Sequence, residues 1–337
     1  MADVHPLRYR DDVEVVPPDE DEVVADIVAM MRTSLQEAFD THRQIASGTH
    51  AKTHGVVTGR LTVADGLPPE LAQGLFAQPG TYEIVLRYSS EPGAIETDVV
   101  PRARGASLKV LDVPGEKLRP GWTSQDFLFN TWPIIPPGDA NAYQQLIQER
   151  SGDVEALSES PDEVGLFDRT PNINPVAHIY FTQGAFRYGD HVAKLSLAPV
   201  TPEQHEAGKR EVTPTDPPGV LSELAREYHA AHPARYELQV QLCTDLDAMP
   251  IEDASIAWDQ EISPYRPVAT IDIPPQESFN PGRRVYAERV MSWRPWNGLV
   301  AHRPPRRRGR PLRPCRRRGG RRTAAGVGPA ARRARSS

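Results

Sequence analysis

Three side chains in short β-rich runs of this 337-residue chain could transfer a proton or bind a carboxylate. The imidazole of His50 can accept a proton and return it, because its ordinary pKa lies close to neutral pH. Arg87 and Ser89 stand two residues apart in the run 84–90, so they share a face if this run is a strand. A guanidinium on such a face can pair with a carboxylate of a bound group. These residue types permit proton transfer and pairing with an anion. The alternative is a strand-end histidine bonded to a backbone group and a solvated arginine on a strand.

Cysteine chemistry and membrane insertion are not indicated. Cys243 and Cys315 lie far apart and match neither a metal-ligand spacing nor a disulfide framework, which suits a reducing compartment. The first 22 residues are strongly acidic and lack the apolar stretch of a signal peptide. No window approaches the 18 or so uninterrupted apolar residues of a membrane span. We therefore expect a cytoplasmic protein without a membrane partner.

The order of apolar patterns predicts an α+β fold. Residues 20–46 carry apolar side chains at the spacing of an amphipathic helix, so one face of this helix should pack on a core. Alternating patterns then predict strands at 56–63, 81–90, 105–113, 124–132, 178–184, 191–200, 235–244 and 267–274. Further helices are predicted at 139–150 and 218–232. Strands in succession with separated helices favour a closed antiparallel β-barrel core with flanking helices, and a β-sandwich is the alternative.

Charge divides the chain into three regions. The chain has 39 Lys and Arg against 45 Asp and Glu, but 14 of the arginines and no acidic residue lie in 303–337. We interpret residues 1–19 as an acidic N-terminal extension, 20–304 as the folded domain and 305–337 as a disordered Arg/Pro/Gly-rich tail. The acidic body repels phosphate backbones, which argues against nucleic acid as its partner, although the tail could bind nucleic acid non-specifically.

Six segments, taken in their order, resemble the haem catalase family, and more closely its small, catalase-related members. They are 48–63, 84–90, 101–110, 124–133, 186–199 and 263–304. The resemblance identifies 20–304 as a catalase-like haem domain. It implies a haem cofactor and decomposition of hydrogen peroxide, or peroxidase action in which hydrogen peroxide or an organic hydroperoxide oxidises an organic reductant. The oligomeric state is left open, with a homo-oligomer as one outcome.

The resemblance also implies roles for particular residues. His50 matches the distal histidine, which takes a proton from the near oxygen of the peroxide and returns it to the far oxygen. Ser89 matches the serine that lies behind this histidine and can fix its tautomer. Arg87 matches an arginine that contacts a haem propionate.

A polar side chain, usually asparagine, should also hold the peroxide over the haem. The alignment slips in the region 124–132, so Thr123, Gln125 and Asn130 remain alternatives, and Asn130 is the asparagine among them. Phe127 and Phe129 alternate with the polar residues there. Phe129 is the candidate for the haem edge, and core packing is the interpretation that we favour for both rings.

The sequence departs from the family on the side of the iron ligand. Larger catalases have a propionate-binding arginine where this chain has Ser47, and the family binds iron through the tyrosine of an Arg-x-x-x-Tyr motif. No tyrosine follows Pro304, none of the ten tyrosines has an arginine four residues before it, and Tyr286 has the wrong spacing. The iron ligand is therefore unknown.

The abrupt change to Arg, Pro, Gly and Ala after Pro304 is what another reading frame of a GC-rich gene would encode. Without the tyrosine, the alternative function is a catalytically impaired barrel that binds haem or an apolar ligand.

Overall fold

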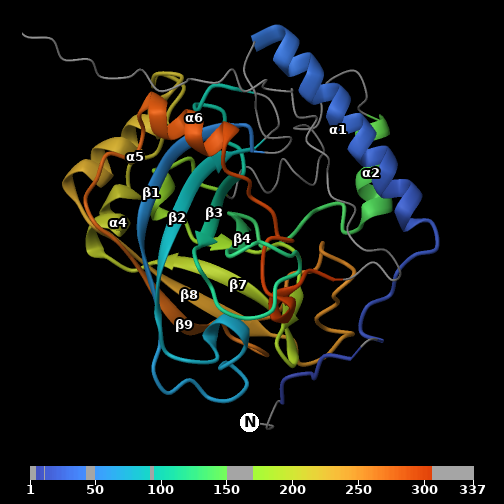
Figure 1. The fold of residues 1–337 in the computed structure, drawn as a ribbon. Helices are drawn as coiled ribbons and strands as arrows, with labels where there is room; N and C mark the ends of the chain where they lie inside the picture. The colour runs from blue at the N-terminus through green and yellow to red at the C-terminus, as the bar shows by residue number, and fades with distance from the viewer. Residues whose placement is uncertain (1–4, 11, 43–49, 92–94, 150–169, 306–337) are drawn as a thin grey trace, which may run out of the picture. The chain divides into compact units, whose positions relative to one another are not determined.

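The computed structural model describes residues 5–10, 12–42, 50–91, 95–149 and 170–305. Their strands form one sheet in the order β5-β4-β3-β2-β1-β9-β8-β7-β6, and β5 also pairs with β7. This pairing closes eight strands into a barrel (Figure 1). β6 pairs with β7 outside the ring. All of the strand pairs are antiparallel. The predicted closed antiparallel barrel with flanking helices is confirmed.

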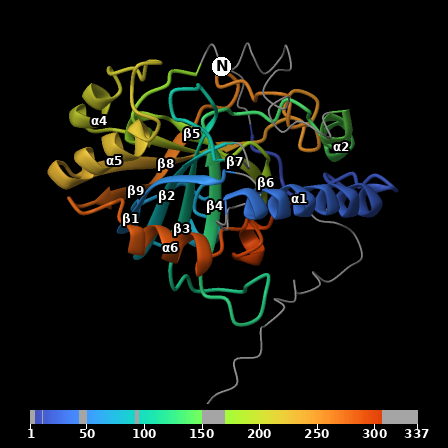
Figure 2. The same ribbon diagram turned by 90° about the horizontal axis from the view of Figure 1, so that it is seen from above.

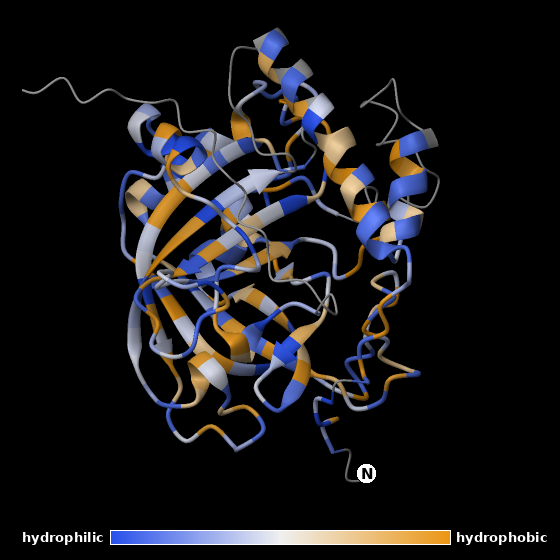
Figure 3. Ribbon diagram, turned by 45° about the vertical axis from the view of Figure 1, so that its right-hand side comes forward, coloured by the Kyte–Doolittle hydropathy of each residue, from blue (hydrophilic) through white to orange (hydrophobic). Residues whose placement is uncertain are grey.

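Of the nine strands in the described residues, eight overlap predicted runs, although β5 is much shorter than the run 178–184, and β6 has no predicted counterpart. The strands are β1 Lys52–Val63, β2 Thr81–Ser90, β3 Arg104–Val110, β4 Gln125–Asn130, β5 Tyr180–Phe181, β6 Phe186–Tyr188, β7 His191–Pro199, β8 Ala234–Leu242 and β9 Arg266–Ile273. Alternate residues of each strand point to opposite faces, and apolar residues fill the barrel. Leu86, Leu108 and Phe129 belong to this core. Apolar and polar segments accordingly alternate along the strands in Figure 3.

The long N-terminal helix packs less of its surface than its pattern predicts. α1, Glu20–His42, lies beside α2, Ala140–Glu149, in both Figure 1 and Figure 2. Of the predicted apolar face, Val23 and Ile27 are buried, whereas Val28 and Phe39 are exposed. The helix therefore exists as predicted, but only part of its apolar face meets the protein body.

Three shorter helices and several 3₁₀ turns complete the described part of the chain. α4, Pro202–Ala207, begins with a capping box made by Thr201 and Gln204. α5 spans Val220–Ala231, and α6 spans Pro281–Arg289 with Asn280 as its N-cap. Arg283 of α6 donates a hydrogen bond from Nη1 to the carbonyl of Val56 at 3.0 Å, which ties α6 to β1. No helix in the described ranges is long and apolar enough to cross a membrane.

The segment that precedes the Arg-rich tail is packed against the barrel. His302 is buried among the rings of Phe76, Phe127 and Tyr188, and its Nε2 accepts a hydrogen bond from the Leu75 amide at 2.9 Å. The backbone of Arg303 accepts a hydrogen bond from Arg187. The predicted tail lies outside the described residues from 306 onward.

Buried histidines give the fold a specific response to acid. Burial lowers the pKa of His229 from its ordinary 6.5 to about 4. The ring stacks on Tyr88, and neither of its nitrogens has a hydrogen-bond partner among the described residues. Between about pH 4 and 6.5 the unfolded chain therefore binds a proton that the folded chain does not, so acidification destabilises the fold.

Replacing His229 with phenylalanine should remove this penalty. The stability gain is the free energy of unfolding of His229→Phe minus that of the unaltered chain. We expect this gain to be about 2 kcal/mol larger at pH 5 than at pH 7.5. Urea unfolding at the two pH values measures the gain, and His232→Phe, at an exposed position three residues later, is the control. Equal gains of His229→Phe at both pH values would contradict the account.

Candidate functional site

His50 stands immediately before β1 in a backbone conformation that side-chain-bearing residues rarely adopt. Its φ is 53°, in the left-handed region. Arg87 on β2 fixes this turn, because its Nη2 donates to the His50 carbonyl at 2.8 Å and its Nε donates to Thr53 Oγ1 at 3.0 Å. Arg87 is itself buried. The backbone of His50 is thus fastened to the second strand of the barrel.

Gly105 on β3 provides the space for the His50 ring. A Cβ atom at Gly105 would lie 2.6 Å from both Cε1 and Nδ1 of His50, and 3.1 Å from Oγ of Ser89. A real Cβ atom essentially never lies within 3.0 Å of another residue's heavy atom, so the ring can occupy this position only because residue 105 has no side chain. The Ser89 hydroxyl also lies beside Gly105 and donates to the Gly105 carbonyl at 3.4 Å.

Substitution of Gly105 should therefore move the ring rather than unfold the barrel. We expect Gly105→Ala to shift the His50 ¹³Cε1 and ¹H resonances and to cost roughly 1–3 kcal/mol of stability, as overpacking does. Histidine NMR spectra and urea unfolding measure the two effects. Gly219, where an added Cβ would meet no atom within 4 Å, provides the control variant Gly219→Ala. An unchanged His50 resonance in Gly105→Ala would contradict the proposed packing.

Asn130, the last residue of β4, faces the other ring nitrogen. Its Nδ2 lies 3.5 Å from Nε2 of His50, and its Oδ1 accepts a hydrogen bond from the Trp132 amide at 3.0 Å. Because Trp132 engages the oxygen, the amide group presents its NH₂ to His50. A donor at this position favours the tautomer in which Nε2 of His50 has the free lone pair.

Burial keeps the site histidine neutral. Desolvation, followed by the positive charges of Arg87 and Arg104, lowers the pKa of His50 to about 3. Burial also lowers the pKa of Arg87, to about 10, so this arginine remains a cation at neutral pH. The site therefore combines a proton acceptor, Nε2 of His50, with the positive charge of Arg87, which is hydrogen-bonded to the His50 carbonyl.

A buried polar cluster lies next to the site, where β1, β2 and β3 meet. Ser90 Oγ is 2.5 Å from His54 Nε2 and accepts a hydrogen bond from Arg104 Nη1, also at 2.5 Å. Arg104 donates from Nη2 to Asn172 Oδ1 at 2.6 Å. Lys52 forms an ion pair with the buried Asp98 at 2.6 Å. These bonds hold together the strand ends that carry His50, Ser89 and Gly105.

The structure brings together four of the five predicted site residues. His50, Arg87, Ser89 and Asn130 meet around Gly105, and Phe129 does not join them. Phe129 pairs with Ala106 in the barrel core and packs against Phe127 at a centroid distance of 6.4 Å. Adjacent residues of a strand point to opposite faces, so the expectation of Phe129 at a cofactor edge on the Asn130 face is corrected here to core packing.

The geometry also separates the three alternatives for the distal polar residue. Thr123 is exposed, and Gln125 lies at the far end of β4, where its Oε1 accepts a hydrogen bond from the Leu299 amide at 2.8 Å. Asn130 is the one of the three that lies beside His50.

Other expectations meet the structure only in part. Arg87 bonds to protein oxygens and forms no ion pair with a carboxylate among the described residues. The hydroxyl of Ser89 bonds to Gly105 rather than to the ring of His50. Ser47 lies outside the described residues, and Tyr286 is exposed on α6. Sequence reasoning missed Gly105, because nothing but its residue type marked it within a β-rich run.

These residues fit one side of a haem and do not supply the bond to iron. The neutral ring of His50, the donor amide of Asn130 and the space left by Gly105 suit the distal side, where a peroxide would bind. The described residues contain no group of three His, Cys, Asp or Glu that could hold a metal ion. The sequence contains no Arg-x-x-x-Tyr motif.

Comparison with solved structures identifies the architecture. A fungal catalase superposes with a TM-score of 0.57 and 16% identity over 80% of this chain and 57% of its own. Catalase A from Saccharomyces cerevisiae gives 0.58 and 16% over 89% and 63%, and a bacterial catalase gives 0.50 and 16% over 81% and 62%. This chain thus spans about 60% of their length. No protein-family model and no curated protein sequence matches the chain. At this identity the comparison establishes the fold, which is catalase-like.

Proposed function

We propose that this chain is a haem-dependent, peroxide-decomposing protein of the catalase type. It would act as a catalase on hydrogen peroxide, or as a peroxidase that couples hydrogen peroxide or an organic hydroperoxide to an organic reductant. The observation that carries the proposal is the buried, neutral His50 ring with the Asn130 amide 3.5 Å from its Nε2, on a catalase-like barrel.

The residues of this site have different roles in the proposed reaction. Nε2 of His50 accepts a proton from the bound peroxide and returns it to the second oxygen, which is general acid–base catalysis. Asn130 donates a hydrogen bond that holds the peroxide beside this nitrogen. Arg87 and Gly105 are positioning residues, because they fix the backbone and the ring of His50 and need not touch the peroxide.

A bound haem would supply the iron on which the O–O bond is cleaved. The absent Arg-x-x-x-Tyr motif favours a second function for the chain as written, namely binding of haem or an apolar ligand without rapid turnover. The two functions share the distal site and differ in the rate of peroxide consumption.

Titration with haemin separates these functions. We expect a saturating Soret band at one haemin per chain and peroxide consumption faster than that of the same concentration of free haemin. Saturable binding with the rate of free haemin would leave only the second function. If haemin fails to bind, the first function is wrong for this chain, and only binding of an apolar ligand remains of the second.

A further inference from the structure

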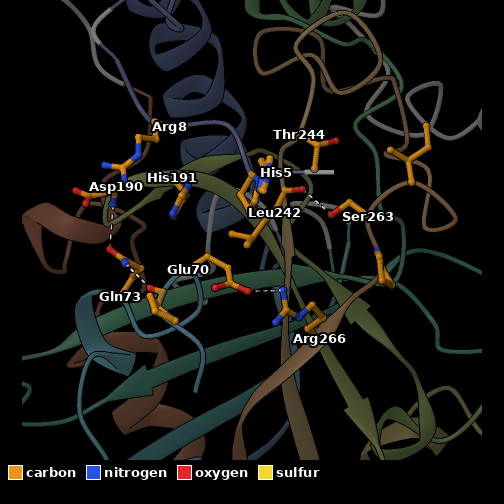
Figure 4. A pocket seen from close by; sticks show the side chains of 14 residues that line it. His5, Arg8, Glu70, Gln73, Asp190, His191, Leu242, Thr244, Ser263 and Arg266 are labelled. Atoms are coloured by element: carbon orange, nitrogen blue, oxygen red, sulfur yellow. Dashed lines mark hydrogen bonds and ion pairs between the residues drawn. The ribbon is translucent and has the colours of Figure 1, made fainter. Parts of the chain in front are cut away.

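A second polar site lies at the end of the barrel opposite His50. His50 precedes β1, whereas this cavity of about 740 Å³ is lined by residues that follow β1, end β8 and begin β7 and β9 (Figure 4). Its volume falls within the usual range for small-molecule pockets, and polar and apolar groups share its walls about equally. The lining residues used below are Arg8, Glu70, Asp190, His191, Thr244 and Arg266.

Arg8 brings a cation to the cavity without a protein partner. Within the described residues its side chain makes no hydrogen bond or ion pair, although its backbone bridges to His191. The backbone on both sides is fixed, because the Leu7 amide donates to the Cys243 carbonyl and the Tyr9 amide donates to the Asp190 carbonyl, each at 2.7 Å. The unpaired guanidinium therefore projects from an anchored segment.

The residues after Arg8 strengthen this anchor. The ring of Tyr9 is contacted by the guanidinium carbons of Arg187 at 4.6 Å and Arg303 at 5.1 Å from the ring centroid. Glu14 forms an ion pair with Arg303 at 3.1 Å, and both side chains are more than nine-tenths buried. The segment that carries Arg8 is thus held against the barrel by a cluster of charged and aromatic groups.

His191 presents a hydrogen-bond acceptor to the same cavity. Its Nδ1 lies 3.0 Å from the Leu7 carbonyl and therefore donates to it, which leaves the lone pair on Nε2. His191 as a whole is 8% exposed. A ligand hydroxyl would satisfy this nitrogen, and the Thr244 hydroxyl lies on the same wall.

The acidic residues of the cavity do not neutralise Arg8. Glu70 is paired with Arg266 at 2.9 Å. A backbone hydrogen bond, together with the bond from Arg266, keeps the pKa of Glu70 below its ordinary value despite partial burial. Asp190 is exposed at the rim and forms no ion pair with Arg8 in the described part of the chain. Among the described residues, Arg8 is therefore an unpaired cation of this cavity, and Asp190 at the rim is an unpaired anion.

We propose that this cavity binds a small hydroxy acid, with its carboxylate paired to Arg8 and a hydroxyl donating to Nε2 of His191. The guanidinium and the carboxylate form a charge-assisted pair, and the histidine selects for the hydroxyl. This proposal does not rest on peroxide chemistry at His50, because the two sites share no residue.

Isothermal titration calorimetry on the full chain with three six-carbon probes tests the proposal. Gluconate has both groups, hexanoate lacks the hydroxyls and sorbitol lacks the carboxylate. We expect saturable binding of gluconate. Sorbitol should bind at least about tenfold more weakly, the usual loss for a hydrogen bond to a charged group, and hexanoate about two- to tenfold more weakly, the usual loss for a hydrogen bond between neutral groups. Absence of saturable gluconate binding, or equal binding of all three probes, would overturn the proposal.

Two variants test whether Arg8 binds the carboxylate of the ligand and whether His191 binds its hydroxyl. Arg8→Gln should weaken gluconate at least about tenfold, and His191→Phe should reduce gluconate to the affinity of hexanoate. Arg60→Gln, on β1 with an exposed ion pair to Glu83, is the matched control and should bind normally. His50→Ala should also bind gluconate normally, which separates this site from the proposed peroxide site. Unchanged gluconate affinity in Arg8→Gln would show that the assignment is wrong.

Discussion

The His50→Ala variant, loaded with haemin, is expected to consume peroxide about 10²–10⁴ times more slowly than the unaltered chain, the usual range for loss of a general acid–base group. Bound haemin per chain should remain nearly the same, because in the proposed site His50 faces the peroxide and does not ligate the iron. Initial rates of oxygen release measure the first quantity, and the Soret absorbance measures the second. The combination of a lost rate with retained haem separates a proton-transfer role from a structural one.

Two controls sharpen this experiment. His232→Ala removes an exposed histidine and should leave both quantities unchanged. Asn130→Ala keeps the imidazole but removes the donor 3.5 Å from Nε2, so it should raise the peroxide concentration needed for half-maximal rate more than it lowers the maximal rate. A His50→Ala rate within a factor of about two of the unaltered chain would exclude His50 as the proton-transfer group.

Restoration of an Arg-x-x-x-Tyr segment after Pro304 is expected to have the second large effect. A tyrosinate must ionise although the ordinary pKa of a phenol is near 10, and an arginine one helical turn away, together with a ferric ion, lowers that cost. Loss of an outer-shell partner of a metal ligand already costs about 10–100-fold. We therefore expect the restored chain to gain at least about 100-fold in peroxide consumption per bound haem.

The gene is the place to look for such a segment. Translation of the other two reading frames beyond codon 304 should reveal Arg-x-x-x-Tyr, and a chain that continues in that frame is the variant to assay. The matched control has phenylalanine in place of this tyrosine. If the restored chain and its phenylalanine control turn over peroxide equally, the missing tyrosine is not what limits the chain.

Most of the barrel could be predicted from local patterns, because each strand alternates apolar and polar residues between turn-forming residues. The run 81–90 was predicted with the same bounds as β2, and 191–200 differs from β7 by one residue. Two elements had weaker signals. β6 has only three residues, and α6 is an arginine-rich helix with a single buried residue, Ala287, so neither carries an apolar period.

The site was less predictable because it depends on contacts between strands. Arg87 and Ser89 follow from strand alternation, and the same rule shows that Phe129 and Asn130 cannot share a face. The bond from Arg87 to the His50 carbonyl depends on the left-handed turn at His50. No sequence pattern predicts this turn. The role of Gly105 appears only when β3 is placed beneath the ring.

The claim that His50 overlooks a bound haem is tested most directly by histidine ¹³Cε1 NMR with one equivalent of haemin. Paramagnetic iron broadens nearby resonances, and the His50→Ala variant identifies the signal. We predict that the His50 resonance is broadened beyond detection, while that of His191, at the opposite end of the barrel, persists. A sharp His50 resonance in a chain with haemin fully bound would contradict the account.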